Sequence, residues 1–169
     1  VVVERYEPVM DTGGAGLHRG GCGIEKQYLF LRPGAFTVND DRAVLDPWGI
    51  GGGESGGRSA KLLVRADGTR EELASKMDDV QVQAGDRLIF RTAGAGGWGD
   101  PLERDAALVE RDVRRRLVSK EAARELYGVV VDDAAATAAR RAEILAARGG
   151  EALPRFDFGE MPAGLVPPR

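Results

Sequence analysis

Apolar and polar residues in the first half of the chain follow no helical period and form short β-type runs instead. Valine, isoleucine, tyrosine and phenylalanine are common in these runs, and glycine, proline or aspartate closes most of them, which is typical of strands bounded by turns. Asp67-Gly68 gives the strongest turn signal, because both residues tolerate the positive φ angles of a tight hairpin. The pattern predicts strands at residues 1–6, 24–31, 35–38, 80–82 and 87–92, and a hairpin over 62–70.

A period of 3.6 residues begins after Asp100-Pro101 and predicts a change to helical structure. Two acid–base pairs spaced by four residues, Glu110 with Arg114 and Asp112 with Arg116, should each stabilise this segment by about 0.3 kcal/mol. The apolar stripe of this first helical segment consists of Leu102, Ala106, Val109, Val113 and Leu117.

Capping residues predict two further helices. Ser119 is a good N-cap for a helix over 120–127, and Gly128 can adopt the left-handed conformation that ends it. The third helix is rich in alanine and should bury little surface; its expected boundary residues are Asp132 or Asp133, Arg148 and Gly149.

The last segment, residues 150–169, contains four prolines and predicts an extended tail. Its apolar residues need a surface to cover, in this chain or in a partner: Phe156, Phe158, Met161, Leu165 and Val166. The whole pattern indicates an α+β fold, with a glycine-rich β region at 1–99, a helical region of two or three helices at 100–149, and the tail.

Glycine is the unusual component, with 24 of 169 residues and no collagen-like period. Many glycines cluster in three loops, at residues 11–23, 48–57 and 94–99. Such loops permit close backbone approach, and they can also cradle a phosphate. The third loop has no Gly-Lys-Ser/Thr ending, and the carboxylate of Asp100 follows it, so it does not match a P-loop or a dinucleotide fingerprint.

Charge and cysteine content narrow the possible partners. The net charge is −3 and the isoelectric point about 5.3, and the basic clusters at 114–116 and 140–141 lie among acids on predicted helices. We interpret those clusters as solvated, paired faces and expect no nucleic-acid partner.

No apolar run approaches the length of a membrane span. The single cysteine, Cys22, and the absence of a visible signal peptide predict a reducing, cytoplasmic compartment.

Few residues are available for catalysis or metal binding. His18 is the only histidine and Cys22 the only cysteine, so we expect no self-contained transition-metal site and no metal bound by this chain. The serines carry no Gly-x-Ser-x-Gly elbow, so a complete catalytic triad is not expected either.

Three blocks, taken in order, resemble the C-terminal part of the hydantoinase B/oxoprolinase family. The blocks are DTGGAGLHRGGCG at 11–23, PWGIGGG at 47–53, and GDRL at 85–88 followed by TAGAGGWGDPLERD at 92–105, with matches continuing to about residue 131. Family subunits are considerably longer, so the resemblance implies that this chain is a C-terminal fragment of one subunit, inactive alone. In members that bind a metal, the histidine and aspartate ligands lie in the N-terminal part.

The resemblance also implies partners and a reaction class. Members of the family work with a partner that binds ATP with Mg²⁺. This partner is a hydantoinase A-type subunit or an equivalent half of one long chain. One branch opens cyclic amides such as 5-oxoproline or N-methylhydantoin through a phosphorylated intermediate. Another branch carboxylates ketones such as acetone or acetophenone. A third interpretation is that this segment is a non-catalytic scaffold that also contacts the N-terminal part of its own subunit.

The polar residues of the three loops are the candidate site residues. Histidine exchanges protons near neutral pH and arginine pairs with anions, so His18, Arg19 and Asp11 are the candidate catalytic residues. We predict that the three loops converge to line an active-site wall or a subunit interface. The alternative is that the two aspartates cap turns and the tryptophans belong to the core. The residues expected to line the substrate or interface loops are Trp48, Trp98 and Asp100.

Overall fold

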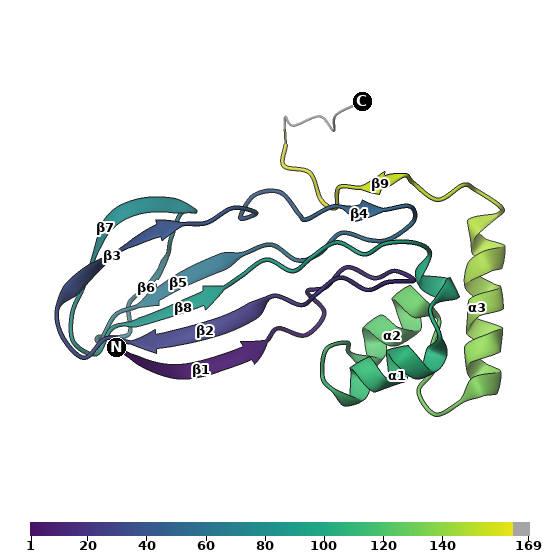
Figure 1. Cartoon of the computed structure of the whole chain (residues 1–169), viewed down its shortest axis with the longest axis horizontal. Helices are drawn as coiled ribbons and strands as arrows, with labels where there is room; N and C mark the ends of the chain where they lie inside the picture. The colour runs from purple at the N-terminus through teal and green to yellow at the C-terminus, as the bar shows by residue number, and fades with distance from the viewer. Residues whose placement is uncertain (164–169) are drawn as a thin grey trace.

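Strands come first along the chain and helices follow, in the computed structural model, which describes residues 1–163 (Figure 1). The predicted α+β class is therefore confirmed. The strands are β1 (Val2–Pro8), β2 (Ile24–Leu29), β3 (Gly34–Asn39), β4 (Gly49–Ile50), β5 (Ala60–Val64), β6 (Arg70–Glu72), β7 (Lys76–Val82), β8 (Arg87–Arg91) and β9 (Phe156–Asp157). The helical elements are the short 3-10 turn η1 (Pro101–Glu103), α1 (Ala106–Arg114), α2 (Lys120–Tyr127) and α3 (Ala134–Arg148).

Five strands form an antiparallel sheet in the order β1-β2-β8-β5-β6. The hairpin predicted at Asp67-Gly68 joins β5 to β6, with Gly68 at a φ of +89°. The two strands predicted at 80–82 and 87–92 are present, but they belong to different sheets, because β7 pairs with β3 while β8 pairs with β2 and β5.

The register of the sheet builds its core. Tyr28, Leu88 and Leu63 lie side by side across β2, β8 and β5, so they share one face. The β3–β7 pair supplies the apolar residues that pack against this face. The buried cluster consists of Val38, Leu63, Leu73, Val80, Val82 and Leu88.

The first helical segment is interrupted, contrary to the single stripe that the sequence predicts. Arg104 is extended after η1, and Asp105 then caps α1 by accepting a hydrogen bond from Ala107 N at 2.9 Å. Beyond the other end of α1, Arg116 adopts a left-handed φ of +57°. Local caps therefore override the apolar period, and Leu102 and Leu117 lie outside α1.

Asp112 does not pair with Arg116, as the four-residue spacing predicts. Arg116 lies beyond the last residue of α1, and the carboxylate of Asp112 is buried against other arginines described below. The Glu110–Arg114 pair is present at 3.9 Å. The four-residue spacing does not predict the partner of Asp112, because α1 ends at Arg114, before Arg116.

The last two helices begin and end where their caps predict. Ser119 Oγ accepts a hydrogen bond from Ala122 N at 3.0 Å, and Gly128 is left-handed. Asp133 caps α3, and Gly149 ends it. Thr137 is the only buried residue of α3, as expected for an alanine-rich surface helix.

After α3 the chain turns back along the molecule (Figure 1). Its strand β9 pairs with β4, and Gly51 N donates to Arg155 O at 2.8 Å. Phe156 and Phe158 therefore lie beside the second glycine loop. The predicted contacts of Leu165 and Val166 lie outside the described residues.

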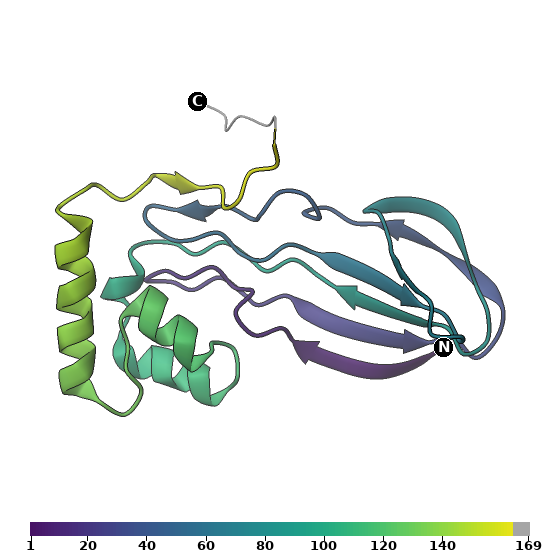
Figure 2. The same ribbon diagram turned by 180° about the vertical axis from the view of Figure 1, so that it is seen from behind.

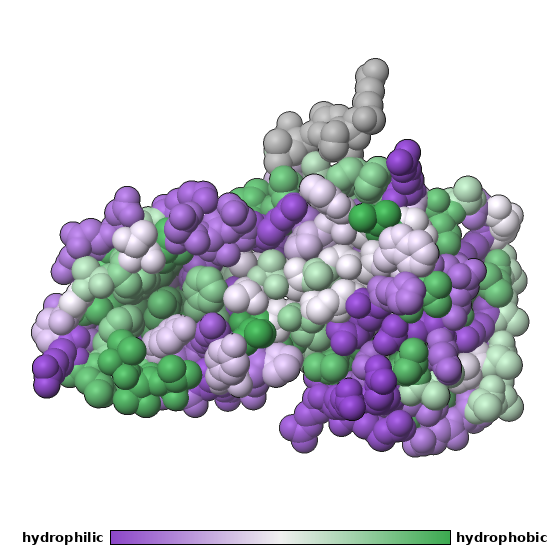
Figure 3. Space-filling view, viewed as in Figure 1, coloured by the Kyte–Doolittle hydropathy of each residue, from purple (hydrophilic) through white to green (hydrophobic). Residues whose placement is uncertain are grey.

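Apolar side chains are exposed at the end of the molecule where β1 begins. All seven residues of β1, an edge strand, are exposed. Figure 3 shows a hydrophobic area at this end and a centre of intermediate hydropathy. Within residues 1–163, no helix is both long and apolar enough to cross a bilayer.

Candidate functional site

The three glycine loops meet at one end of the five-stranded sheet. Glu25 of β2 lies opposite Arg91 of β8, which lies opposite Ala60 of β5. Because neighbouring strands are antiparallel, the segment before β2, the segment before β5 and the segment after β8 all leave the sheet at this end (Figure 2). The glycine loops are these segments. We name them the first loop (11–23), the second loop (48–57) and, with Asp100 now included, the third loop (94–100).

Backbone hydrogen bonds connect every pair of loops. Gly14 N in the first loop donates to Ala95 O in the third at 2.8 Å. Glu54 N in the second loop donates to Ala15 O in the first at 2.7 Å, and Gly97 N in the third donates to Glu54 O at 2.8 Å. The predicted convergence of the three loops is therefore present in the structure.

Glycine is required where the loops touch. A Cβ atom on Gly20 would collide with the carbonyl oxygen of Ala95, and one on Gly96 would collide with that of Trp48. Both obstacles are backbone atoms, so no side-chain movement could relieve them. These glycines therefore allow close packing of three backbones, and an anion cradle is not needed to explain them.

His18 and Trp98 form the exposed part of this junction. His18 N donates to Trp98 O at 2.9 Å, and Trp98 N donates to His18 O at 3.0 Å. Their rings are 5.4 Å apart between centroids. Trp98 is 52% exposed, so its ring is available to a ligand or a partner while its backbone is fixed.

The tryptophans do not belong to the core, which corrects the alternative interpretation. Trp48 is 44% exposed and lies 6.1 Å from the ring of Phe158, which the returning tail supplies. The guanidinium carbon of Arg42 lies over the Trp48 ring, 4.6 Å from its centroid. Trp48 is therefore part of an exposed aromatic surface beside the second loop.

Asp11 and Asp100 connect the loops to the helices. Asp11 Oδ1 accepts from Ser119 N, at the start of α2, at 2.7 Å. Asp100 Oδ1 accepts from Leu102 N at 2.9 Å, and its Oδ2 pairs with Arg148 at 2.6 Å. Both aspartates thus accept from backbone N–H groups at the start of a helical element, and Asp100 also forms an ion pair with α3. No contact tests the predicted catalytic role of Asp11, which stays a prediction.

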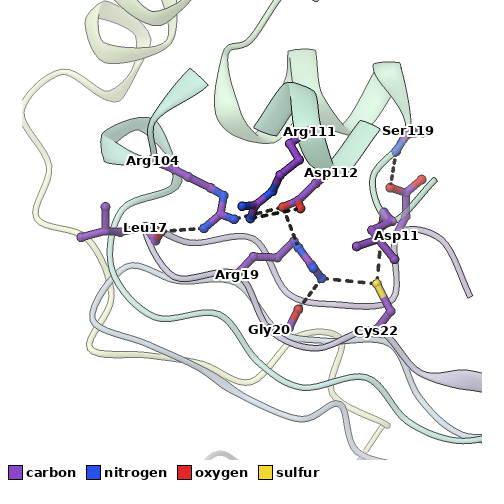
Figure 4. A network of polar contacts seen from close by, with 10 residues as sticks. Asp11, Leu17, Arg19, Gly20, Cys22, Arg104, Arg111, Asp112 and Ser119 are labelled. Carbon is purple, nitrogen blue, oxygen red and sulfur yellow. Dashed lines mark hydrogen bonds and ion pairs between the residues drawn. The ribbon is translucent and has the colours of Figure 1, made fainter. Parts of the chain in front are cut away.

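Arg19 extends towards Asp112 of α1 (Figure 4). Its Nε donates to the buried carboxylate of Asp112 at 3.1 Å, and its Nη1 donates to Gly20 O at 2.6 Å. Cys22 Sγ is 3.3 Å from the same Nη1. Arg19 therefore has bonds that hold the loop in place, and its predicted catalytic role stays a prediction.

Sequence reasoning missed two residues: Glu54, within the second loop, and Tyr127, at the end of α2. Burial, and then the nearby charge of Asp157, raise the pKa of Glu54. Burial raises the pKa of Tyr127 to about 12, and its hydroxyl has no hydrogen-bond partner within residues 1–163. Tyr127 ends the apolar stripe of α2, a pattern that indicates core packing without indicating polar neighbours.

In the part of the chain that the structure describes, no three histidine, cysteine, aspartate or glutamate residues gather closely enough to hold a metal ion. Cys22 is half-buried. Its thiol lies 3.5 Å from Leu117 O.

The family model for hydantoinase B/oxoprolinase matches residues 1–101, which include all three glycine loops. The chain belongs to this family. The match includes the first and second blocks quoted above and most of the third. The resemblance drawn from those blocks is confirmed.

Two relatives and two solved structures show what the chain is similar to. It is 36% identical to caprolactamase subunit beta of Pseudomonas jessenii over 84% of this chain and 26% of that protein. It is 36% identical to 5-oxoprolinase 1 of Arabidopsis thaliana over 60% of this chain and 8% of that protein.

The crystal structure of the ATP-dependent caprolactamase from P. jessenii superposes with a TM-score of 0.67 at 32% identity, over 83% of this chain and 26% of that one. A nucleotide-free acetone carboxylase structure superposes with a TM-score of 0.65 over 90% of this chain and 26% of that one; at 22% identity, this likeness shows the fold alone. The chain thus spans about a quarter, or less, of the length of these proteins.

Proposed function

We propose that this chain forms part of the B-type subunit of an ATP-dependent cyclic amidohydrolase, which opens the ring of a cyclic amide. The observation that carries the proposal is the agreement of sequence and structure with caprolactamase, at 36% identity and a TM-score of 0.67. The caprolactamase of P. jessenii is ATP-dependent, and the 36% identical relative is its beta subunit.

The proposed reaction needs partners outside the described residues. An unactivated amide is a poor electrophile, and phosphorylation of its oxygen by ATP would give it a better leaving group. We place ATP and Mg²⁺ on a hydantoinase A-type partner, and any catalytic metal on the N-terminal part of the same subunit. The single cysteine remains the basis for expecting a cytoplasmic location.

Within this assembly, we assign the three-loop junction to an active-site wall or to the interface with the partner subunit. The rings of His18 and Trp98 support this role, because the two backbones are hydrogen-bonded to each other while both residues are exposed. Rigid aromatic groups lose little conformational entropy on binding, so they suit contact with a ring-shaped substrate or a partner.

The reaction class is tested by assaying the complete complex. Cyclic amides such as 5-oxoproline, N-methylhydantoin and caprolactam should be hydrolysed with stoichiometric consumption of ATP, and bicarbonate should have no effect. Consumption of acetone or acetophenone that requires both ATP and bicarbonate, without amide hydrolysis, would show a carboxylase instead.

The role of the junction is tested by His18→Ala in the complete complex. We expect turnover to fall about a hundredfold, the lower end of the range for loss of a proton-transferring group, while the subunits still assemble. Gln81→Ala, at an exposed position of β7 outside the three loops, is the control. Unchanged turnover with His18→Ala would favour the scaffold interpretation.

A further inference from the structure

One buried carboxylate joins the helices to the first loop. Asp112 on α1 is 2% exposed. Its Oδ2 accepts hydrogen bonds from Arg19 Nε at 3.1 Å and from Arg104 Nη2 at 3.0 Å (Figure 4). Arg111 lies 3.9 Å from Oδ1. Loss of this charge would leave two enclosed guanidinium groups without their anion, so the arrangement depends on it.

The two arginines that meet at Asp112 also hold the backbone on both sides of His18. Arg104 Nη1 donates to Leu17 O at 2.9 Å, and Arg19 Nη1 donates to Gly20 O at 2.6 Å. A planar guanidinium can make both of its bonds at once in a fixed geometry, which a lysine ammonium on a flexible stem cannot do. The segment 17–20 is therefore fastened to the helices at two points.

The third loop holds the same segment from another direction. His18 exchanges two backbone hydrogen bonds with Trp98, and Gly20 packs against the backbone of Ala95. His18 thus has a fixed backbone and an exposed ring. A shift of the arginines would move the loop that presents this ring to Trp98.

We propose that Asp112 is a positioning residue: through Arg19 and Arg104 it fixes the first loop against Trp98 and so sets the geometry of the His18–Trp98 surface. This inference rests on the proposed function, because it assumes that this surface contributes to turnover. Asp112 itself touches neither the exposed surface nor any reacting group.

The test compares Asp112→Asn with Asp86→Asn in the complete complex. Asp86 is a matched control, since it is also 2% exposed and accepts from Arg65 at 3.1 Å, but it lies at the turn before β8, away from the loops. Both variants should lose stability. With Asp112→Asn, kcat should fall about tenfold or more while KM for ATP changes less than about twofold, because loop displacement misaligns groups without removing ATP contacts.

Amide hydrogen exchange supplies a readout that does not depend on the reaction. Asp112→Asn should speed exchange in peptides covering 12–23 and 94–99, whereas Asp86→Asn should speed it in peptides covering 64–87. Equal kcat values for the two variants, or unchanged exchange in both loop peptides of Asp112→Asn, would overturn the proposal.

Arg104→Lys covers the case in which Asp112→Asn does not assemble. It keeps the positive charge but cannot bridge Leu17 O and Asp112, so we expect the same pattern to a smaller degree. Unchanged kcat and unchanged loop exchange with this variant would also overturn the proposal. If the wild-type complex hydrolyses no cyclic amide, the proposed function fails, and the exchange comparison still decides whether Asp112 positions the loop.

Discussion

Glu54 occupies the centre of the glycine loops, although no motif singles it out. Its backbone forms hydrogen bonds with both other loops. The charges of Asp157 and Arg148 act on its carboxyl group. Burial is the largest influence and raises its pKa; Asp157 acts in the same direction, and Arg148 opposes them. The sequence offers only an acid after four glycines and isoleucine, without the strand-turn-helix frame that would mark a catalytic site.

The raised pKa of Glu54 gives a pH-dependent stability. The folded state holds this proton more tightly than the unfolded state, so stability is lost as pH rises from about 4.5 through the folded pKa. Glu54→Gln mimics the neutral form and should raise the thermal midpoint of the intact subunit at pH 7. The difference should vanish near pH 4. Glu151→Gln, at an exposed position, should show no such change, and a lowered midpoint with Glu54→Gln at pH 7 would contradict the prediction.

At the scale of elements, the close packing of the glycine loops can be tested by comparing two neighbouring glycines of the first loop. Gly20 lies against the backbone of Ala95, whereas a Cβ on Gly21 would meet no atom within 4 Å. Gly20→Ala should therefore lower the free energy of unfolding by about 3 kcal/mol or more, since backbone must move. Gly21→Ala should change it by less than about 1 kcal/mol. Urea unfolding of the intact subunit measures both; similar losses would show that the loops adapt to side chains.

The elements that local chemistry determines could be predicted from the sequence. Ser119, Gly128 and Gly149 act through their own backbone neighbours, so their roles can be predicted without knowing the fold. The break at Arg104 could not be predicted, because the Asp105 cap competes with an apolar period that continues through it. The pairing of β7 with β3 also depends on contacts between distant segments.

The candidate site was predictable only in part, for the same reason. Loop glycines and polar residues indicated the junction, because three loops leaving one sheet end must lie close together. The inward direction of Arg19 and its bond to Asp112 could not be predicted, since 93 positions separate the two residues. Asp112 is spaced for a pair on the helix surface, and only the packing of α1 against the first loop turns it inward.

At the scale of the whole molecule, the glycine loops lie between the sheet and the helices (Figures 1 and 2). The helices pack against the first loop through Ala15, which belongs to the same buried cluster as Val109 and Tyr127. The returning tail bonds to the second loop, and Arg148 at the end of α3 bonds to Asp100 in the third. Each loop is therefore supported by a different part of the C-terminal half.

The two edges of the sheet differ in a way that predicts self-association of the isolated chain. The β6 edge is short and charged, whereas β1 is longer and carries exposed Val3 and Tyr6. Unpaired, apolar edge strands are templates for pairing with another chain. The isolated chain should therefore aggregate or unfold over a broad temperature range. Sedimentation at increasing concentration should show large species, which Val3→Lys with Tyr6→Lys reduces.

Glu72→Lys, on the opposite edge, is the control for added positive charge and should leave self-association unchanged. It substitutes a residue on a strand that is already polar, so it alters charge without covering the β1 edge. A soluble wild-type monomer with a sharp, cooperative transition would contradict the prediction. Equal improvement by the β1 and β6 variants would assign the effect to net charge, because only edge pairing requires the change to lie on β1.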